Sequence, residues 1–259
     1  MALNERITDW RGRRVWLVGA STGIGAALAR ALSARGARLA LSARSREKLE
    51  ALAVSCPGSM LLPLDVTVAG SLDQAHDALM AEWGGIDLVV LNAGTYRPLH
   101  VEELSPTAAR ETIELNLLGV MDGVSVVAPT LLEQGAGGVA IVGSVAGYAG
   151  LPKALVYGAS KAALINFAES LYFDLAPRGV SVYLVSPGFV ATPLTEQNDF
   201  HMPALMQPEQ AADAIVAGLA QGRFEIHFPR RFTLWLKLLR LLPYRWFFPL
   251  VQRATGGGR

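Results

Sequence analysis

The sequence predicts an α/β fold in which a single doubly wound domain holds a seven-stranded parallel sheet flanked by helices. Short apolar runs alternate with longer segments of helical periodicity over most of the chain. Most of these runs end in Gly, Asn, Asp or Ser residues, and open α/β sheets bind their ligands at the carboxyl ends of the strands. No linker or repeat divides residues 1–229, which therefore predict one domain.

The composition is that of a globular chain. Apolar residues make up 51% of the sequence and charged residues 17%, which argues against disorder. Cys56 is the single cysteine and the four histidines lack ligand spacing, so we expect a reducing, cytoplasmic compartment and no metal site. The N-terminal residues form no apolar signal core, and no run of eighteen uncharged apolar residues occurs. We therefore expect neither export nor a membrane span.

The first strand is predicted over residues 14–18 and breaks into Gly19-Ala20-Ser21-Thr22-Gly23-Ile24-Gly25, after which a helical pattern begins. Glycines let the backbone turn tightly and approach a pyrophosphate, and the free N–H groups at a helix start favour negative charge. An ordinary strand-to-helix turn rarely needs three glycines. The sequence of strand, glycine turn and helix therefore favours nucleotide binding.

The second strand, predicted over residues 38–43, ends at Arg44. In dinucleotide folds an acid at this point accepts the 2′-hydroxyl of NAD, whereas an arginine accommodates the 2′-phosphate of NADP. No acid is present, and Arg44 can make charge-assisted hydrogen bonds to phosphate, so NADP is favoured. The alternatives are a solvated Arg44 beside Arg46 and Lys48, or a phosphate contact at Ser21 or Arg46.

The remaining elements follow the same alternation. Strands are predicted at 60–64, 86–91, 139–142, 180–185 and 224–228, and helices at 72–83, 106–132 and 208–220. A further helix carries Tyr157 and Lys161 and runs to about residue 176. The run at 86–91 is apolar throughout, as in a strand buried on both faces.

Tyr157 and Lys161 lie four residues apart, so they share one face of the predicted helix. A phenol releases its proton near pH ~10, and a nearby ammonium lowers that pKa. Such a pair suits proton transfer to or from a substrate oxygen near neutral pH. Taken alone the spacing is weak evidence, since a surface helix with a solvated lysine would show it too.

Together these motifs resemble the short-chain dehydrogenase/reductase family over about residues 14–192. The motifs are Gly19-x3-Gly23-x-Gly25, Asp65-Val66, Asn92-Ala93-Gly94, Asn116, Ser144, Tyr157-x3-Lys161, and Pro187-Gly188 with Thr192. Ser144 precedes Tyr157 by thirteen residues, a spacing common in such enzymes. Two departures occur, Leu91 where Asn is frequent and Gly143 where a second Ser is frequent, and neither removes a catalytic residue.

The resemblance implies a Rossmann-type fold and four catalytic residues. Tyr157 would be the general acid or base, and Lys161 would lower its pKa and hold the nicotinamide ribose. Ser144 would bind the substrate oxygen. Asn116 would anchor a water that links Lys161 to solvent.

The resemblance also implies a binding set for the cofactor, which would supply the hydride chemistry. With Arg44 from the end of the second strand, the expected set is Gly19, Ser21, Thr22, Gly23, Ile24, Gly25, Arg44, Asp65, Val66, Asn92, Ala93, Gly94, Tyr157, Lys161, Pro187, Gly188, Val190 and Thr192.

Substrate selectivity is expected from less regular segments. We expect Ser144, Tyr148, Tyr157 and Phe189 to contact the substrate, together with residues 96–98. A lid is predicted over about residues 193–207, which include Phe200, Met202, Leu205 and Met206. Their apolar and aromatic side chains favour a hydrophobic ketone or alcohol, lipid-like or steroid-like.

A basic and aromatic tail is predicted over residues 230–259. From Arg223 onward the chain holds eight cations and one acid, Glu225, and residues 232–242 read as an apolar helix with a basic stripe. The tail could lie in a membrane interface, or dock on its own domain or on a partner subunit. Its apolar character disfavours nucleic-acid binding.

The predicted function is an NADP(H)-dependent carbonyl reductase or secondary alcohol dehydrogenase for an apolar substrate, in a homo-oligomeric dimer or tetramer. The alternative is a non-catalytic NADP-binding sensor or scaffold. The complete set Asn116, Ser144, Tyr157 and Lys161 argues against that alternative, because a sensor needs only the glycine turn.

Overall fold

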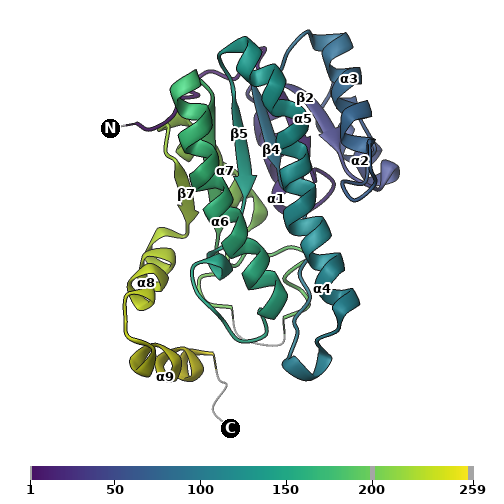
Figure 1. Ribbon diagram of the computed structural model, residues 1–259. Coiled ribbons are helices and arrows are strands. Elements are labelled where there is room, and N and C mark those ends of the chain that lie inside the picture. The colour runs from purple at the N-terminus through teal and green to yellow at the C-terminus, as the bar shows by residue number, and fades with distance from the viewer. Residues whose placement is uncertain (1, 199–201, 256–259) are drawn as a thin grey trace.

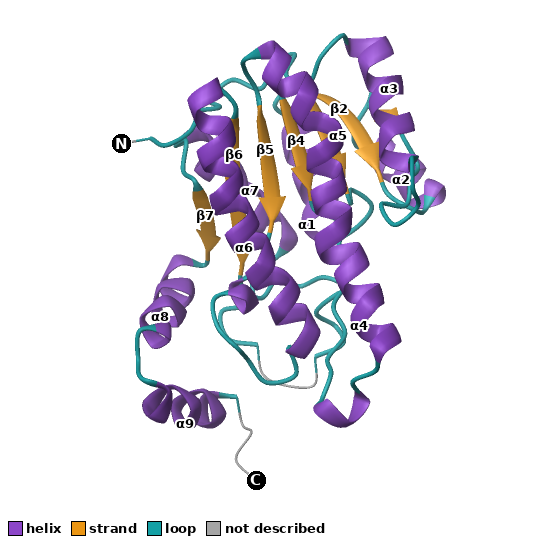
Figure 2. Ribbon diagram, in the orientation of Figure 1, coloured by secondary structure: helices purple, strands orange, loops and turns teal. Residues whose placement is uncertain are grey.

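The computed structural model describes residues 2–198 and 202–255 and contains one parallel sheet (Figures 1 and 2). Its strand order is β3-β2-β1-β4-β5-β6-β7. The strands are β1 Arg14–Val18, β2 Arg38–Ser42, β3 Met60–Leu61, β4 Leu88–Leu91, β5 Gly138–Val142, β6 Ser181–Pro187 and β7 Glu225–Phe228. The order reverses between β1 and β4, which is where open α/β sheets bind ligands. The prediction of a doubly wound, seven-stranded parallel sheet is confirmed.

Helices cover both faces of the sheet, as Figure 1 shows. Apolar residues of α1 (Gly23–Ser33), α2 (Arg46–Ala53) and α7 (Pro208–Ala220) pack on one face. Those of α3 (Ser71–Trp83), α5 (Gly119–Gln134) and α6 (Leu155–Leu175) pack on the other. Every residue of β4, β5 and β6 is buried, which explains the continuous apolar runs of these strands.

Two strands are shorter than predicted by two residues or more. The strand expected over 60–64 ends at Leu61, although the N–H groups of Leu62 and Leu64 still donate to the carbonyl oxygens of Leu41 and Ala43 over 3.0 and 3.1 Å. The strand expected from residue 86 begins at Leu88. The Gln134 side chain binds both backbone groups of Ile86, at 3.0 and 2.8 Å, in place of a neighbouring strand.

The long helix predicted over 106–132 is divided by a π-helical turn. It consists of α4 (Pro106–Ile113), the turn η2 (Glu114–Leu118) and α5. Among the described residues, 106–134 is the one helical stretch long and apolar enough to cross a membrane by length and composition. Its residues Val120, Val124 and Val127 pack against the sheet, as in the core helix of a globular domain.

The tail forms two helices, α8 (Arg230–Arg240) and α9 (Tyr244–Ala254), that extend beyond the carboxyl edge of the sheet (Figure 2). The sequence predicted one helix over 232–242; the structure starts it two residues earlier and adds α9 after Pro243. Leu239, Phe247 and Val251 are buried in a small cluster with the partly buried Leu151. The tail therefore packs in part on its own domain.

Shorter helical turns complete the chain: η1 Val101–Glu103, η3 Val145–Gly147 and η4 Ala176–Arg178. In the segment expected to form a lid, the described residues form turns, and Met206 pairs with Val190 in an isolated parallel bridge. Phe200 of that segment and tail residues 256–259 lie outside the described residues.

Candidate active site

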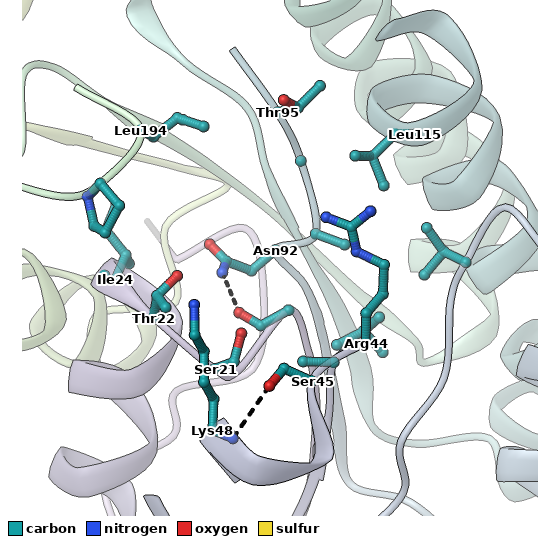
Figure 3. Close-up of a pocket in the computed structure, with 18 of the residues that line it drawn as sticks. Ser21, Thr22, Ile24, Arg44, Ser45, Lys48, Asn92, Thr95, Leu115 and Leu194 are labelled. Atoms are coloured by element: carbon teal, nitrogen blue, oxygen red, sulfur yellow. Dashed lines mark hydrogen bonds between the residues drawn. The ribbon is translucent and has the colours of Figure 1, made fainter. Parts of the chain in front are cut away.

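A cavity of about 420 Å³ opens at the carboxyl ends of β1, β2 and β4 (Figure 3). It gathers most of the residues expected to bind the cofactor. These are Gly19, Ser21, Thr22, Gly23, Ile24, Arg44, Asp65, Val66, Asn92, Ala93, Gly94 and Thr192. We call this cavity the cofactor pocket.

The glycine turn owes its shape to two close approaches. Gly19 has a φ of +91°, and a Cβ there would lie 2.5 Å from the backbone nitrogen of Ala93. A Cβ on Gly25 would overlap the carbonyl oxygen of Gly19, so the absence of a side chain at Gly25 lets the first turn of α1 pack against the glycine turn. Gly25 itself does not line the cofactor pocket. The Asn92 side chain fastens the turn by donating to the Gly19 carbonyl over 2.7 Å.

The start of α1 faces the same cavity. Thr22 stands at the N-cap and makes no side-chain capping hydrogen bond. The first N–H groups of α1 therefore lack side-chain acceptors, and such groups favour an anion. This arrangement fits the pyrophosphate of a dinucleotide.

Two cations line the cofactor pocket beyond β2. Figure 3 shows the Arg44 guanidinium reaching toward Leu115 and the Lys48 ammonium reaching toward Ser21 and Thr22. Arg46 instead faces Glu50 at 3.9 Å and does not line the cavity. The sequence placed Lys48 near this position without assigning it to the site. The residue that could have predicted this position is Ser45, a helix-capping residue: its hydroxyl accepts from the Lys48 N–H and sets the start of α2.

A second, smaller hollow of about 100 Å³ adjoins the first, and we call it the catalytic pocket. Ser144, Tyr157 and Lys161 line it together with Pro187, Gly188, Val190 and Thr192. Ile24, Asn92, Gly94, Thr95, Thr192 and Leu194 line both cavities. The residues expected to transfer protons therefore lie beside those expected to hold the nicotinamide end of the cofactor.

Lys161 is buried and donates from Nζ to the carbonyl oxygen of Val142 over 2.9 Å. Burial lowers the pKa of Lys161 to about 8. Burial raises the pKa of Tyr157, and the hydrogen bond with the Ser144 side chain opposes this rise. The Lys161 ammonium lies 5.8 Å from the Tyr157 ring centroid. Desolvation of the phenolate therefore sets the direction of the Tyr157 pKa, and the predicted lowering of that pKa by Lys161 stays a prediction.

Asn116 is fully buried in the π-helical turn. Its Oδ1 accepts from the Thr95 N–H at 2.7 Å, and its Nδ2 donates to the Thr95 carbonyl at 2.9 Å and to Ser160 Oγ at 3.2 Å. Gly94 lies between Asn116 and Lys161, since a Cβ there would be 3.3 Å from Asn116 Oδ1 and 3.7 Å from Lys161 Nζ. Asn116 thus fixes the backbone after β4, and its predicted role in a water relay stays a prediction.

The structure places two expected substrate residues outside the catalytic pocket. Tyr148 donates its hydroxyl to Glu225 Oε1 over 2.5 Å and lines a cavity beneath the tail. Phe189 turns toward α8, where its ring centroid lies 5.8 Å from that of Phe232. Tyr96 lies beside the expected general acid: its ring is edge-on to that of Tyr157 at a centroid distance of 4.9 Å. Within residues 2–198 and 202–255, no group of three His, Cys, Asp or Glu side chains could hold a metal ion.

Comparison with known proteins identifies the family. The family model described as short chain dehydrogenase matches residues 13–202. An uncharacterized oxidoreductase of Myxococcus xanthus is 36% identical over 245 residues, covering 93% of this chain and 97% of the relative. An uncharacterized oxidoreductase of Staphylococcus epidermidis is 34% identical over 207 residues, covering 79% of this chain and 90% of the relative.

Solved structures agree on the fold. A short-chain dehydrogenase/reductase of Burkholderia phymatum in complex with NAD has a TM-score of 0.81 at 24% identity, covering 89% of this chain and 93% of that one. Levodione reductase has a TM-score of 0.79 at 24% identity, covering 87% of this chain and 99% of that one. With the family match over most of its length and the sheet described above, the chain belongs to the short-chain dehydrogenase/reductase family and is an oxidoreductase of that nicotinamide-dependent family.

Proposed function

We propose that the protein is an NADP(H)-dependent carbonyl reductase, or secondary alcohol dehydrogenase in the reverse direction, for an apolar substrate. The observation that carries the proposal is the meeting of Ser144, Tyr157 and Lys161 in the catalytic pocket beside the cofactor pocket. The bound cofactor would supply the hydride. The protein would supply the proton and hold the substrate oxygen.

Tyr157 can serve as the general acid of the reductive direction. A phenol is protonated at neutral pH, which is the form required of a general acid. As the carbonyl carbon gains a hydride, the carbonyl oxygen takes the proton of the Tyr157 hydroxyl. Ser144 hydrogen-bonds that oxygen and stabilises its developing negative charge. Lys161, on the same face of α6 as Tyr157, would donate to the ribose hydroxyls of the bound cofactor as well as to the Val142 carbonyl.

The cofactor preference rests on charge. Arg44 and Lys48 both line the cofactor pocket, where a 2′-phosphate would gain charge-assisted hydrogen bonds. The one acid in that lining, Asp65, accepts from the backbone N–H and hydroxyl of Thr67 at 3.0 and 2.8 Å. Asp65 follows β3 and not β2. The end of β2, where a carboxylate would accept the 2′-hydroxyl of NAD, therefore carries no acid.

The remaining parts of the proposal concern substrate and surroundings. Val142, Val190 and Leu194 give the catalytic pocket an apolar lining, which suits a hydrophobic ketone. We propose a cytoplasmic homo-oligomer, a dimer or tetramer, in which residues 1–229 form the catalytic domain. The C-terminal tail would contact a membrane surface.

The test is NADPH consumption over a panel of ketones graded by size and polarity. We expect turnover with apolar ketones, and we expect Tyr157→Phe to abolish turnover while NADPH fluorescence still reports binding. A non-catalytic NADP-binding sensor would instead bind NADPH and reduce no ketone in the panel. Undiminished turnover by Tyr157→Phe would refute the catalytic assignment.

A further inference from the structure

The tail helices expose large apolar side chains that the proposed reaction does not use. Between residues 234 and 250, nine such side chains are at least 36% exposed. They are Leu234, Trp235, Leu238, Leu241, Leu242, Tyr244, Trp246, Phe248 and Leu250, and Leu241 reaches 79%. Exposed apolar side chains gathered on a globular protein mark an interaction site. Tyr244 and Phe248 line the cavity between the tail and the domain, and we call the other seven residues the apolar tail face.

Arginines without acidic partners accompany the apolar tail face. Among the residues that the structure describes, no carboxylate forms an ion pair with Arg230, Arg231, Arg240, Arg245 or Arg253. Glu225, the single acid from residue 223 onward, is already bound to Lys237 and Tyr148. The positive charge of the tail is therefore available to an anionic partner.

The inner side of the tail is fixed to the domain. Thr233 is fully buried, and its hydroxyl lies 2.6 Å from Nδ1 of His227 on β7. Phe247 and Val251 hold α9 in place. The two helices are thus packed on the domain and are not a free end of chain.

The length of the helices excludes a membrane span and fits a surface position. Each of α8 and α9 has eleven residues, which gives a length of about 16 Å at the usual rise. A bilayer hydrocarbon core is about 30 Å thick. Pro243 separates the helices, so they do not add up to one spanning helix. Helices with Trp, Phe and Leu on one side and arginines at the border lie in the interface plane.

We propose that α8 and α9 dock the protein on the surface of an anionic lipid bilayer. The apolar tail face enters the boundary between headgroups and acyl chains, and Arg230, Arg231, Arg245 and Arg253 contact lipid phosphates. Figures 1 and 2 place both helices beyond the carboxyl edge of the sheet, so docking turns the end that bears the catalytic pocket toward the bilayer. This proposal develops the membrane contact of the proposed function and is independent of the reaction.

A second copy of the chain is the competing occupant. In a symmetric dimer the same surface patch meets itself. Two tails would then bring their unpaired arginines together with no acid to neutralise them, and this repulsion disfavours that arrangement. Anionic headgroups supply the missing negative charge.

The test is flotation of the full chain with vesicles of phosphatidylcholine, with or without phosphatidylglycerol, at low and high salt. We expect binding to the anionic vesicles that weakens with salt. Arg245→Gln with Arg253→Gln should weaken partition about 30-fold at low salt, from the usual contribution of surface cations at an anionic membrane. The matched control is Arg110→Gln with Arg178→Gln, two exposed arginines of the domain, which should bind as the unaltered chain does.

Apolar insertion is tested separately. Leu241→Ser with Trp246→Ser should abolish flotation, whereas Val54→Ser with Phe173→Ser, which alter exposed apolar residues elsewhere, should not. Phospholipids with brominated acyl chains should quench the fluorescence of Trp235 and Trp246, because Trp10 and Trp16 are buried and Trp83 packs partly buried against the core. Quenching that persists in the Leu241→Ser, Trp246→Ser variant would contradict insertion through the apolar tail face.

Two results overturn the proposal. The first is an unaltered chain that stays at the bottom of the gradient with anionic vesicles. The second is flotation unchanged by either tail variant. If the Leu241→Ser, Trp246→Ser variant lowers the molar mass by light scattering and no protein floats, the apolar tail face is instead an interface between copies. Turnover of a water-soluble ketone is measured beside each assay, so failure of the proposed reaction is distinguished from failure of docking.

Discussion

The hydroxyl of Tyr148 donates to Oε1 of Glu225 over 2.5 Å, and this hydrogen bond joins the segment after Ser144 to the last strand of the sheet. The Lys237 ammonium of α8 binds the other carboxylate oxygen of Glu225. One partly buried carboxylate therefore holds together the loop beside the catalytic pocket, β7 and the tail. The Lys237 and Tyr148 hydrogen bonds keep the pKa of Glu225 below its ordinary value, although burial acts in the opposite direction.

Removal of this hydrogen bond should cost stability more than activity. We expect Tyr148→Phe to lower the free energy of unfolding by about 1.5–3 kcal/mol, the usual contribution of a hydrogen bond to a charged group. Turnover should change little, because Tyr148 does not line the catalytic pocket. Urea unfolding measures the first quantity and NADPH consumption the second. Tyr244→Phe is the control, since Tyr244 is 59% exposed. Equal effects of the two substitutions would contradict the assigned role.

Lys161 should make stability rise with pH in the alkaline range. Its pKa is about 8 in the folded protein and about 10.4 in an unfolded chain. Between these values the unfolded state binds more protons, so the free energy of unfolding increases with pH and the penalty of burying the charged ammonium disappears. We expect the unaltered chain to gain stability relative to Lys161→Met between about pH 8 and pH 10. Chemical denaturation across that range measures the difference, and a constant difference would contradict the pKa shift.

Arg44 and Lys48 should set the cofactor preference. Lys48→Ala and Arg44→Asp should each weaken NADPH binding roughly 10–100-fold through loss of a charge-assisted hydrogen bond, with a much smaller effect on NADH. Arg44→Asp should also favour NADH by supplying an acceptor for the 2′-hydroxyl. Fluorescence titration with both cofactors measures these changes. Arg46→Ala is the matched control because Arg46 does not line the pocket. An effect of Arg46→Ala as large as that of Lys48→Ala would relocate the phosphate contact.

Gly19 should tolerate no side chain. Its φ of +91° is strained for any L-residue, and a Cβ would press on the Ala93 nitrogen. Gly19→Ala should therefore lower the free energy of unfolding by at least about 2 kcal/mol and weaken NADPH binding. Gly150→Ala serves as control, because nothing lies within 4 Å of a Cβ at Gly150. Urea unfolding and NADPH titration of the two variants check the prediction, and equal stability would refute it.

The central sheet and the core of the site were predictable from the sequence because their signals are local. Apolar runs indicate buried strands, and the rule that ligands meet the carboxyl ends of strands brings the Gly19 turn and Ser144 to one edge. The four-residue spacing of Tyr157 and Lys161 places them on one helix face, which the structure directs into the catalytic pocket.

Other features depend on contacts that spacing does not reveal. The partner that draws Tyr148 away from the catalytic pocket, Glu225, is 77 residues distant along the chain. Lys48 enters the cofactor pocket because Ser45 sets where α2 starts, and element boundaries are the least reliable part of a sequence prediction. The tail pattern indicated one amphipathic helix, but which of its sides faces the domain is decided by packing on Leu151.

The π-helical turn Glu114–Leu118 rotates the side chains of α4 about the helix axis relative to those of α5. A π turn holds one residue more than an α turn, and each residue of an α-helix is rotated by about 100° from the one before it. The extra residue therefore offsets the face of α4 from that of α5. The valines of α5 face the sheet while Asn116 faces Thr95. Because the offset lies at Asn116, a one-residue deletion there would leave a continuous helix and turn the amide away from the site.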